Sequence, residues 1–183
     1  MGQGGLVGRL MNAGALVRRL SIVALVLAAG AVSIVSIYLL TPVDAEIAFW
    51  WPAAGVSVVA VLVSRSNRTA VVASIAVVTA LGNVIGGREL LVAALFGIAN
   101  AVEAWLVAWV VTRGNLVARL DSLRDVSRLA VASVVGASAF GVLAGAMAWL
   151  LLERDFLPTA LGLLASHASA VLVITPVALV SSR

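Results

Sequence analysis

Apolar residues form six long stretches along this chain, and short polar gaps between them carry nearly all of the charge. The stretches cover about residues 20–40, 47–63, 69–85, 90–111, 129–152 and 157–180. Each has roughly 17–24 residues, and a helix of that length crosses a hydrocarbon core of ~30 Å. Because backbone groups in lipid must be hydrogen-bonded within their own segment, the stretches predict helices. The predicted fold is an all-α integral membrane protein, a bundle of about six transmembrane helices.

The arginines predict how these helices are oriented. Ten of the twelve fall into every second gap, and the remaining gaps carry only Arg88 and Arg154. Because arginine-rich loops stay in the cytoplasm, both termini are predicted to be cytoplasmic in a multi-pass protein of the bacterial inner (plasma) membrane. The basic excess follows from this topology, so the lipid bilayer is a predicted partner and nucleic acid is not. The ten are Arg9, Arg18, Arg19, Arg65, Arg68, Arg113, Arg119, Arg124, Arg128 and Arg183.

Residues 1–19 are predicted to form a cytoplasmic lead, and residues 20–182 a six-span membrane domain. The first apolar run, of about 20 residues, exceeds the 7–15-residue core of a signal peptide, so we expect it to be retained as a span. In the lead, Leu6, Leu10 and Val17 share one side of a helix, a pattern suited to lying on the membrane surface.

The longest polar gap, residues 113–128, has an amphipathic pattern. Helical spacing separates its apolar residues Leu116, Leu120, Leu123 and Val126. The pattern predicts a helix on the inner leaflet. Such a helix is either an orientation signal and lipid anchor or a contact that relays motion to a cytoplasmic partner.

The composition narrows the chemistry that the chain can perform. It is 63% hydrophobic and 11% charged, which no soluble domain of this length matches. The absence of cysteine and lysine excludes disulfides, thiolate metal sites and Schiff-base catalysis. No phosphate-binding loop and no Ser/His/Asp set is recognisable. We therefore expect no catalytic residue, cofactor or metal site here, and any enzymatic output would belong to a downstream domain or partner.

Three polar side chains lie deep inside predicted spans. Glu103 is about 20 Å from the outer end of the fourth span, and Asn100 precedes it by one helical turn. His167 lies at a depth of about 15 Å in the sixth span, level with Asn100. A charged Glu at this depth costs ~3 kcal/mol or more unless it is paired or protonated. The three residues either form the floor of a polar ligand pocket or join the two spans through a structural hydrogen bond.

An aromatic cluster lies on the outer side, around the start of the second span. It comprises Tyr38, Phe49, Trp50, Trp51 and Pro52, with Asp44 and Glu46 nearby. The simpler interpretation is an interfacial anchor. The alternative is an outward-facing ligand pocket with aromatic walls, in which Pro52 opens the helix and Gly55 lets another helix approach.

The fifth span is rich in small residues. Gly141 and Gly145 form a small-xxx-small pair, which predicts a tight helix-packing face. The pattern leaves open whether that face packs within the bundle or between two chains.

Four segments, in this order, resemble the first family of bacterial membrane-associated sensor domains (MASE type one). They are WPAAGV at 51–56, GIANAVEAWLVAW at 97–109, LDSLRDV at 120–126 and VITP at 173–176. The family-type positions among them are Trp51, Pro52, Gly55, Asn100, Glu103 and Pro176. The chain departs from the family at His167, where an Asp usually stands, and it has fewer spans than the family often has.

The resemblance, which covers roughly residues 45–182, implies a sensory input module. Such modules precede histidine kinases, or diguanylate cyclases and phosphodiesterases, so the implied partner is a cytoplasmic kinase or cyclic-dinucleotide output domain. The ligand of the family is generally undefined, and the dimeric nature of most outputs implies a homodimer. One alternative is the substrate-binding subunit of an energy-coupling-factor vitamin transporter, with Ala24 and Ala28 suited to docking a partner helix. Another is a structural scaffold without a ligand.

Overall fold

The computed structural model of this chain describes residues 3–41, 48–64, 67–113 and 120–181, and describes the side chains of 14–180 within these ranges. The described residues form six helices and no strand, which confirms the all-helical fold class. The helices are α1 (Gln3–Leu40), α2 (Pro52–Ser64), α3 (Arg68–Ile85), α4 (Leu90–Val111), α5 (Leu123–Leu152) and α6 (Phe156–Ser181). Five are long and apolar enough to cross a membrane, whereas α2 is shorter. These features indicate a multi-pass membrane protein.

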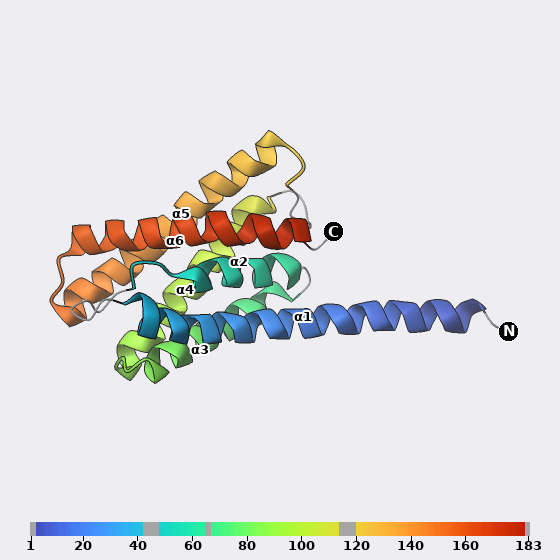
Figure 1. Cartoon of the computed structure of the whole chain (residues 1–183), viewed down its shortest axis with the longest axis horizontal. Coiled ribbons are helices and arrows are strands. Elements are labelled where there is room, and N and C mark those ends of the chain that lie inside the picture. The colour runs from blue at the N-terminus through green and yellow to red at the C-terminus, as the bar shows by residue number, and fades with distance from the viewer. Residues whose placement is uncertain (1–2, 42–47, 65–66, 114–119, 182–183) are drawn as a thin grey trace.

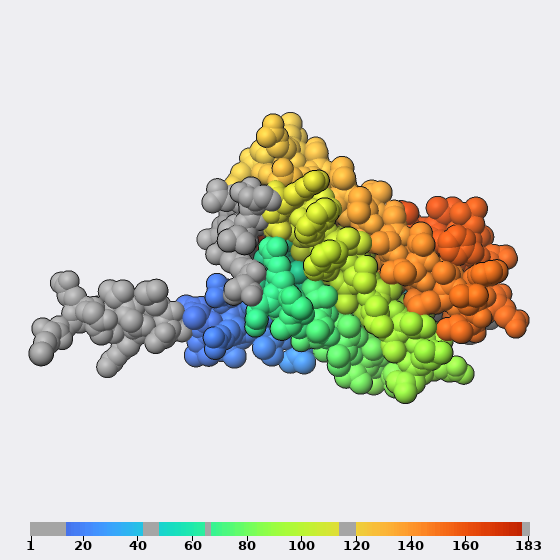
Figure 2. All heavy atoms as spheres, turned by 180° about the vertical axis from the view of Figure 1, so that it is seen from behind, coloured from blue at the N-terminus to red at the C-terminus, as the bar shows by residue number. Residues whose placement is uncertain are grey.

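Successive helices run in opposite directions, so α1 begins and α6 ends at the same end of the bundle (Figure 1). At that end α1 extends beyond the other helices (Figure 1). The space-filling view shows α3, α4 and α5 covering one face of the molecule (Figure 2). The short helix α2 packs against α1, α3, α4 and α6, and most of its residues are buried. Its small and β-branched residues let these helices approach closely, so α2 forms the centre of the bundle.

The first helix is longer than its predicted span. It is continuous from Gln3 to Leu40, and no break separates residues 3–19 from the predicted membrane segment. As far as they are described, residues 3–19 therefore continue the helix of the first predicted span, and their position at the membrane surface stays a prediction. The reason is that Arg18 and Arg19 are good helix formers, so they mark a border of lipid and not an end of the helix.

The second helix is shorter than predicted. The predicted span began at residue 47, but Ala48–Trp51 are non-helical and α2 starts at Pro52. Proline is well suited to the first position of a helix, where its missing N–H costs no hydrogen bond. Pro52 thus begins the helix and does not open it. At ~1.5 Å per residue α2 spans about 20 Å, less than a hydrocarbon core.

The fifth helix starts before the predicted span. Ser122 caps it, its side chain accepting from the backbone N–H of Asp125, while the Asp125 carboxylate accepts from the backbone of Ser122. This capping box moves the helix start to Leu123. The predicted separate amphipathic helix is therefore not formed by residues 120–128, since its second half continues into α5. Arg65, Asp44, Glu46, Leu116, Arg119 and Arg183 lie outside the described residues, as do the side chains of Leu6, Arg9 and Leu10.

Glycines allow close helix crossings at α6. A Cβ added at Gly141 would lie 2.6 Å from the carbonyl oxygen of Ala160, and one at Gly145 would lie 3.0 Å from the Ala160 Cβ. The small-residue face of α5 therefore packs against α6 within the chain. Gly55 packs in the same way against α6, where its added Cβ would meet Ala170 and Ile174. These contacts hold α6 between α2 and α5.

Candidate functional site

A buried pair joins α4 to α6 in the middle of the bundle. Nδ1 of His167 lies 2.6 Å from Oε2 of Glu103, and each residue is only 1% exposed. Glu103 is about 20 Å along α4 and His167 about 16 Å along α6, and the two helices run in the same direction (Figure 1). Similar depth brings the two side chains together, although the backbones of α4 and α6 do not pack directly on each other and both helices pack on α2 and α5.

Trp51 and Asn100 extend this pair toward the end of the bundle where α2 begins. The indole Nε1 of Trp51 donates to Oδ1 of Asn100 at 3.1 Å, and Nδ2 of Asn100 donates to the Phe96 carbonyl at 2.9 Å. The Trp51 ring lies parallel to that of His167, with centroids 6.3 Å apart. Four residues predicted from the sequence therefore lie together: Asn100 and Glu103 of α4, His167 of α6, and Trp51 from the segment before α2.

Phe140 of α5 completes the surroundings of the histidine. Its ring is stacked on the His167 ring, with centroids 3.6 Å apart and planes 19° apart. Phe140 is not among the residues predicted from the sequence, because a phenylalanine in an apolar span carries no signal of its own. The available clue was that Phe140 is the only aromatic residue among the small residues of the fifth span up to Gly145. A single bulky ring on a small-residue face indicates a space that the ring must fill.

Gly136 explains how Glu103 becomes so deeply buried. A Cβ at Gly136 would lie 3.3 Å from the Glu103 carbonyl oxygen and 3.4 Å from its Cγ, and it would also collide with Val107. Helix α5 therefore passes directly over the Glu103 side chain. Among the described residues, Oε1 of Glu103 and Oγ of Ser166 are buried without a hydrogen-bond partner. A buried polar atom in this state is costly, so Oε1 of Glu103 retains the capacity to accept a hydrogen bond.

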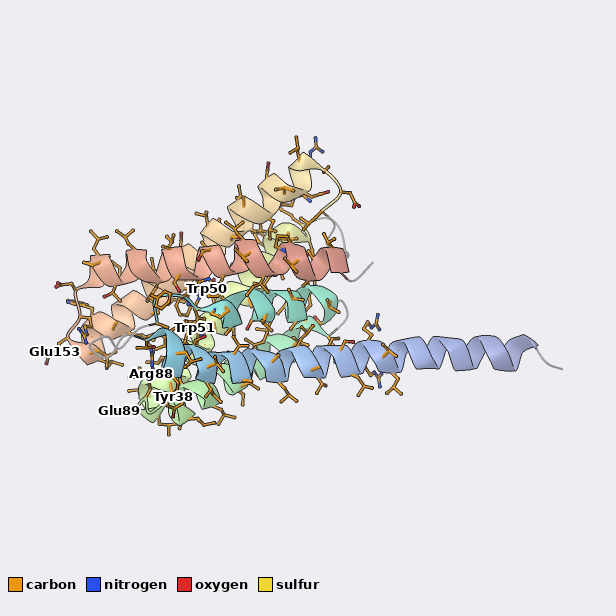
Figure 3. All side chains as sticks on the ribbon, viewed as in Figure 1. Tyr38, Trp50, Trp51, Arg88, Glu89 and Glu153 are labelled. Atoms are coloured by element: carbon orange, nitrogen blue, oxygen red, sulfur yellow. The ribbon has the colours of Figure 1, made fainter. Side chains whose placement is uncertain are left out.

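The aromatic cluster predicted on the outer side is divided in the structure. Trp51 points into the bundle, whereas Phe49 is 67% exposed and Trp50 is half-buried against the core (Figure 3). Tyr38 is exposed, and its hydroxyl donates to the Ile85 carbonyl at 3.0 Å. Only Trp51 of this cluster contacts the buried pair, and Pro52 serves as the first residue of α2.

The space beside His167 is very small. A cavity of about 10 Å³ is lined by Ala48, Trp51, Arg88, Phe96, Phe140, Leu163 and His167. Arg88 lies over the Phe96 ring, 4.7 Å from its centroid, and toward the end of the bundle where α2 begins (Figure 3). Pockets for small organic molecules measure about 300–1,000 Å³, whereas one water needs about 10–15 Å³. The polar centre has room for about one water and for no organic ligand in this conformation.

Comparisons with known proteins identify no relative of this chain. No protein-family model, no curated protein and no solved structure matches this chain. Within the described residues no group of three His, Asp or Glu side chains could hold a metal ion.

Proposed function

We propose that this chain is a membrane-embedded sensory input module, in which the Glu103–His167 contact is the element that the stimulus rearranges. The supporting observation is a single buried, ionisable contact between α4 and α6, with one carboxylate oxygen lacking a partner. Ionisable residues inside a membrane are expensive and usually serve a function. A contact that changes with protonation or hydration gives the bundle two alternative packings. Signalling requires two such states, one of which the stimulus stabilises more than the other.

The size of the cavity favours a small stimulus. An organic ligand has no space beside His167, so the proposal is that a proton or a water reaches the pair, or that a change in the membrane shifts α6 against α4. Either event would change the surroundings of Trp51 and Phe140, because both rings are stacked on the His167 ring. The same observation weighs against the vitamin-transporter alternative, since the predicted residues enclose no volume for a vitamin.

Helix α6 is the proposed relay. It continues from His167 to Ser181 and contains Pro176, which cannot donate its backbone hydrogen bond and so weakens the helix one turn before its end. Between the two, Ala170 and Ile174 pack on Gly55 of α2. A shift at His167 would therefore move the end of α6. In the proposed orientation that end is cytoplasmic and acts on a kinase or cyclic-dinucleotide output domain, as a homodimer.

A reporter fusion tests this function. We would join residues 1–183 to a cytoplasmic diguanylate cyclase domain and measure cyclic dinucleotide per amount of membrane-inserted protein. Glu103→Gln removes the ionisable carboxyl group but keeps its shape, and it is expected to change the output about fivefold or more, the lower end of typical coupling between sites.

The matched control is Glu89→Gln, which makes the same change at the exposed N-cap residue of α4. It is expected to leave the reporter at the wild-type level. Equal output from wild type, Glu103→Gln and Glu89→Gln, at equal insertion, would refute the proposed role of the buried pair.

A further inference from the structure

A long groove runs between α1 and α3 on the side of the bundle. Its volume is about 930 Å³, and the end of α2 contributes to one end of it. The groove closes where Gly30 meets α3, since an added Cβ there would lie 3.2 Å from the Cβ of Val78. From Arg18 to Gly30 the distance along α1 is about 18 Å, close to the depth of one leaflet of a ~30 Å hydrocarbon core.

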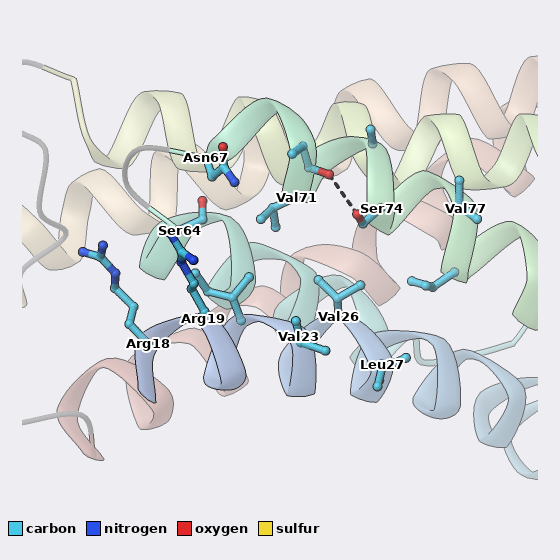
Figure 4. Close-up of a pocket in the computed structure, with 14 residues that line it drawn as sticks. Arg18, Arg19, Val23, Val26, Leu27, Ser64, Asn67, Val71, Ser74 and Val77 are labelled. Carbon is cyan, nitrogen blue, oxygen red and sulfur yellow. Dashed lines mark hydrogen bonds between the residues drawn. The ribbon is translucent and has the colours of Figure 1, made fainter. Parts of the chain in front are cut away.

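The two ends of the groove differ in chemistry. Arg18, Arg19, Ser64 and Asn67 surround one end, where Figure 4 shows the arginine side chains on the same side as Ser64. Beyond them the lining is almost entirely aliphatic, as the labelled residues Val23, Val26, Leu27, Val71 and Val77 show (Figure 4). No carboxylate occurs in the lining. The groove therefore pairs two cations at one end with an apolar channel along the rest.

This combination matches one class of molecule. Guanidinium groups bind phosphate through paired hydrogen bonds, and an apolar channel of leaflet depth suits an acyl chain. Asn67, which lines this end of the groove, is the N-cap residue of α3 and makes no side-chain capping bond, so the start of α3 lies at this end. Backbone N–H groups at a helix start favour a negative group. A groove inside a bilayer also loses contacts if it stays empty, so a lipid chain or another helix fills it.

We propose that this groove binds one anionic phospholipid, with its phosphate at Arg18 and Arg19 and one acyl chain between α1 and α3. A second copy of the chain is less suitable, because it would bring its own arginine-rich end beside these two arginines. The site is separate from the Glu103–His167 pair, so the proposal does not depend on a sensory function. In the proposed orientation the lipid belongs to the inner leaflet.

Lipid retention by the purified protein tests the proposal. We would extract the full chain in detergent, add phosphatidylglycerol or phosphatidylcholine, and count bound lipids by native mass spectrometry. Retention of one phosphatidylglycerol per chain, at least about tenfold stronger than phosphatidylcholine, is expected from two arginines near an anionic headgroup. Arg18→Gln with Arg19→Gln is expected to remove this preference. The matched control is Arg124→Gln with Arg128→Gln on α5, which deletes two arginines away from the groove and should change nothing.

A second variant leaves every charge in place. Ser74→Trp puts a large ring into the apolar part of the groove from an exposed position on α3, and it is expected to abolish retention with the topology intact. Three results would overturn the proposal: equal retention of both lipids, unchanged retention in both groove variants, or displacement of the lipid by inorganic phosphate alone. A dimer that Ser74→Trp dissociates, without any change in lipid retention, would assign the groove to a second copy instead.

Discussion

Replacing Gly55 with leucine is expected to lower the free energy of unfolding by about 3 kcal/mol, the upper range for overpacking a core. A Cβ at this position would lie 2.6 Å from the Cβ of Ile174 and 2.7 Å from the carbonyl oxygen of Ala170. Both neighbours belong to α6, and the carbonyl oxygen is backbone that cannot rotate away. The larger side chain must therefore push α2 away from α6.

The matched control for this prediction is Gly162→Leu. Gly162 lies on α6, is exposed, and an added Cβ would meet nothing within 4 Å. Its replacement is expected to change stability by less than about 1 kcal/mol, because a helical Gly gains propensity when replaced. The measurement is unfolding of the purified proteins in mixed micelles with increasing dodecyl sulfate. Equal stabilities of the two variants would show that α2 does not pack on α6 at Gly55.

Replacing Glu103 alone is expected to lower the free energy of unfolding more than replacing both Glu103 and His167. Glu103→Leu leaves His167 buried without its hydrogen bond, at a cost of about 1–3 kcal/mol. Adding His167→Leu deletes the unpaired group as well, so the double variant should recover most of that loss. The same micelle unfolding measures the three free energies. Additive losses in the double variant would mean that the two side chains do not interact in the folded bundle.

The buried pair could be predicted from the sequence because the depth of a residue in a span follows from its position along the helix. Apolar length locates each span, and the rise per residue then places Glu103 and His167 at similar depth. The cost of a charge in lipid indicates that both face the interior. The contact of Trp51 with Asn100 was less accessible, since it requires knowing that Trp51 precedes α2 and turns inward while Trp50 does not.

Helix ends were harder to predict than spans. A charged residue ends an apolar stretch, but it does not have to end the helix. Arg18 and Arg19 mark the edge of the apolar region, yet α1 continues through them. Ser122 and Asp125 form a capping box that starts α5 six residues before the apolar stretch at residue 129. The size of the central cavity depends on how Phe140 fills the space beside His167, which no single-residue pattern contains.

The central claim is that the Glu103–His167 contact sets the position of α6 relative to α4. Because the chain has no cysteine, spin labels on Trp109→Cys and Val180→Cys would report only these two helices. Both sites are exposed, at 50% and 59%, near the ends of α4 and α6. The measurement is the distance distribution between the labels in liposomes, by pulsed electron paramagnetic resonance. We expect Glu103→Gln to shift it by about 1–2 Å or more, the scale of helix movements in switching proteins, and Glu89→Gln to leave it unchanged. Identical distributions in all three proteins would contradict the claim.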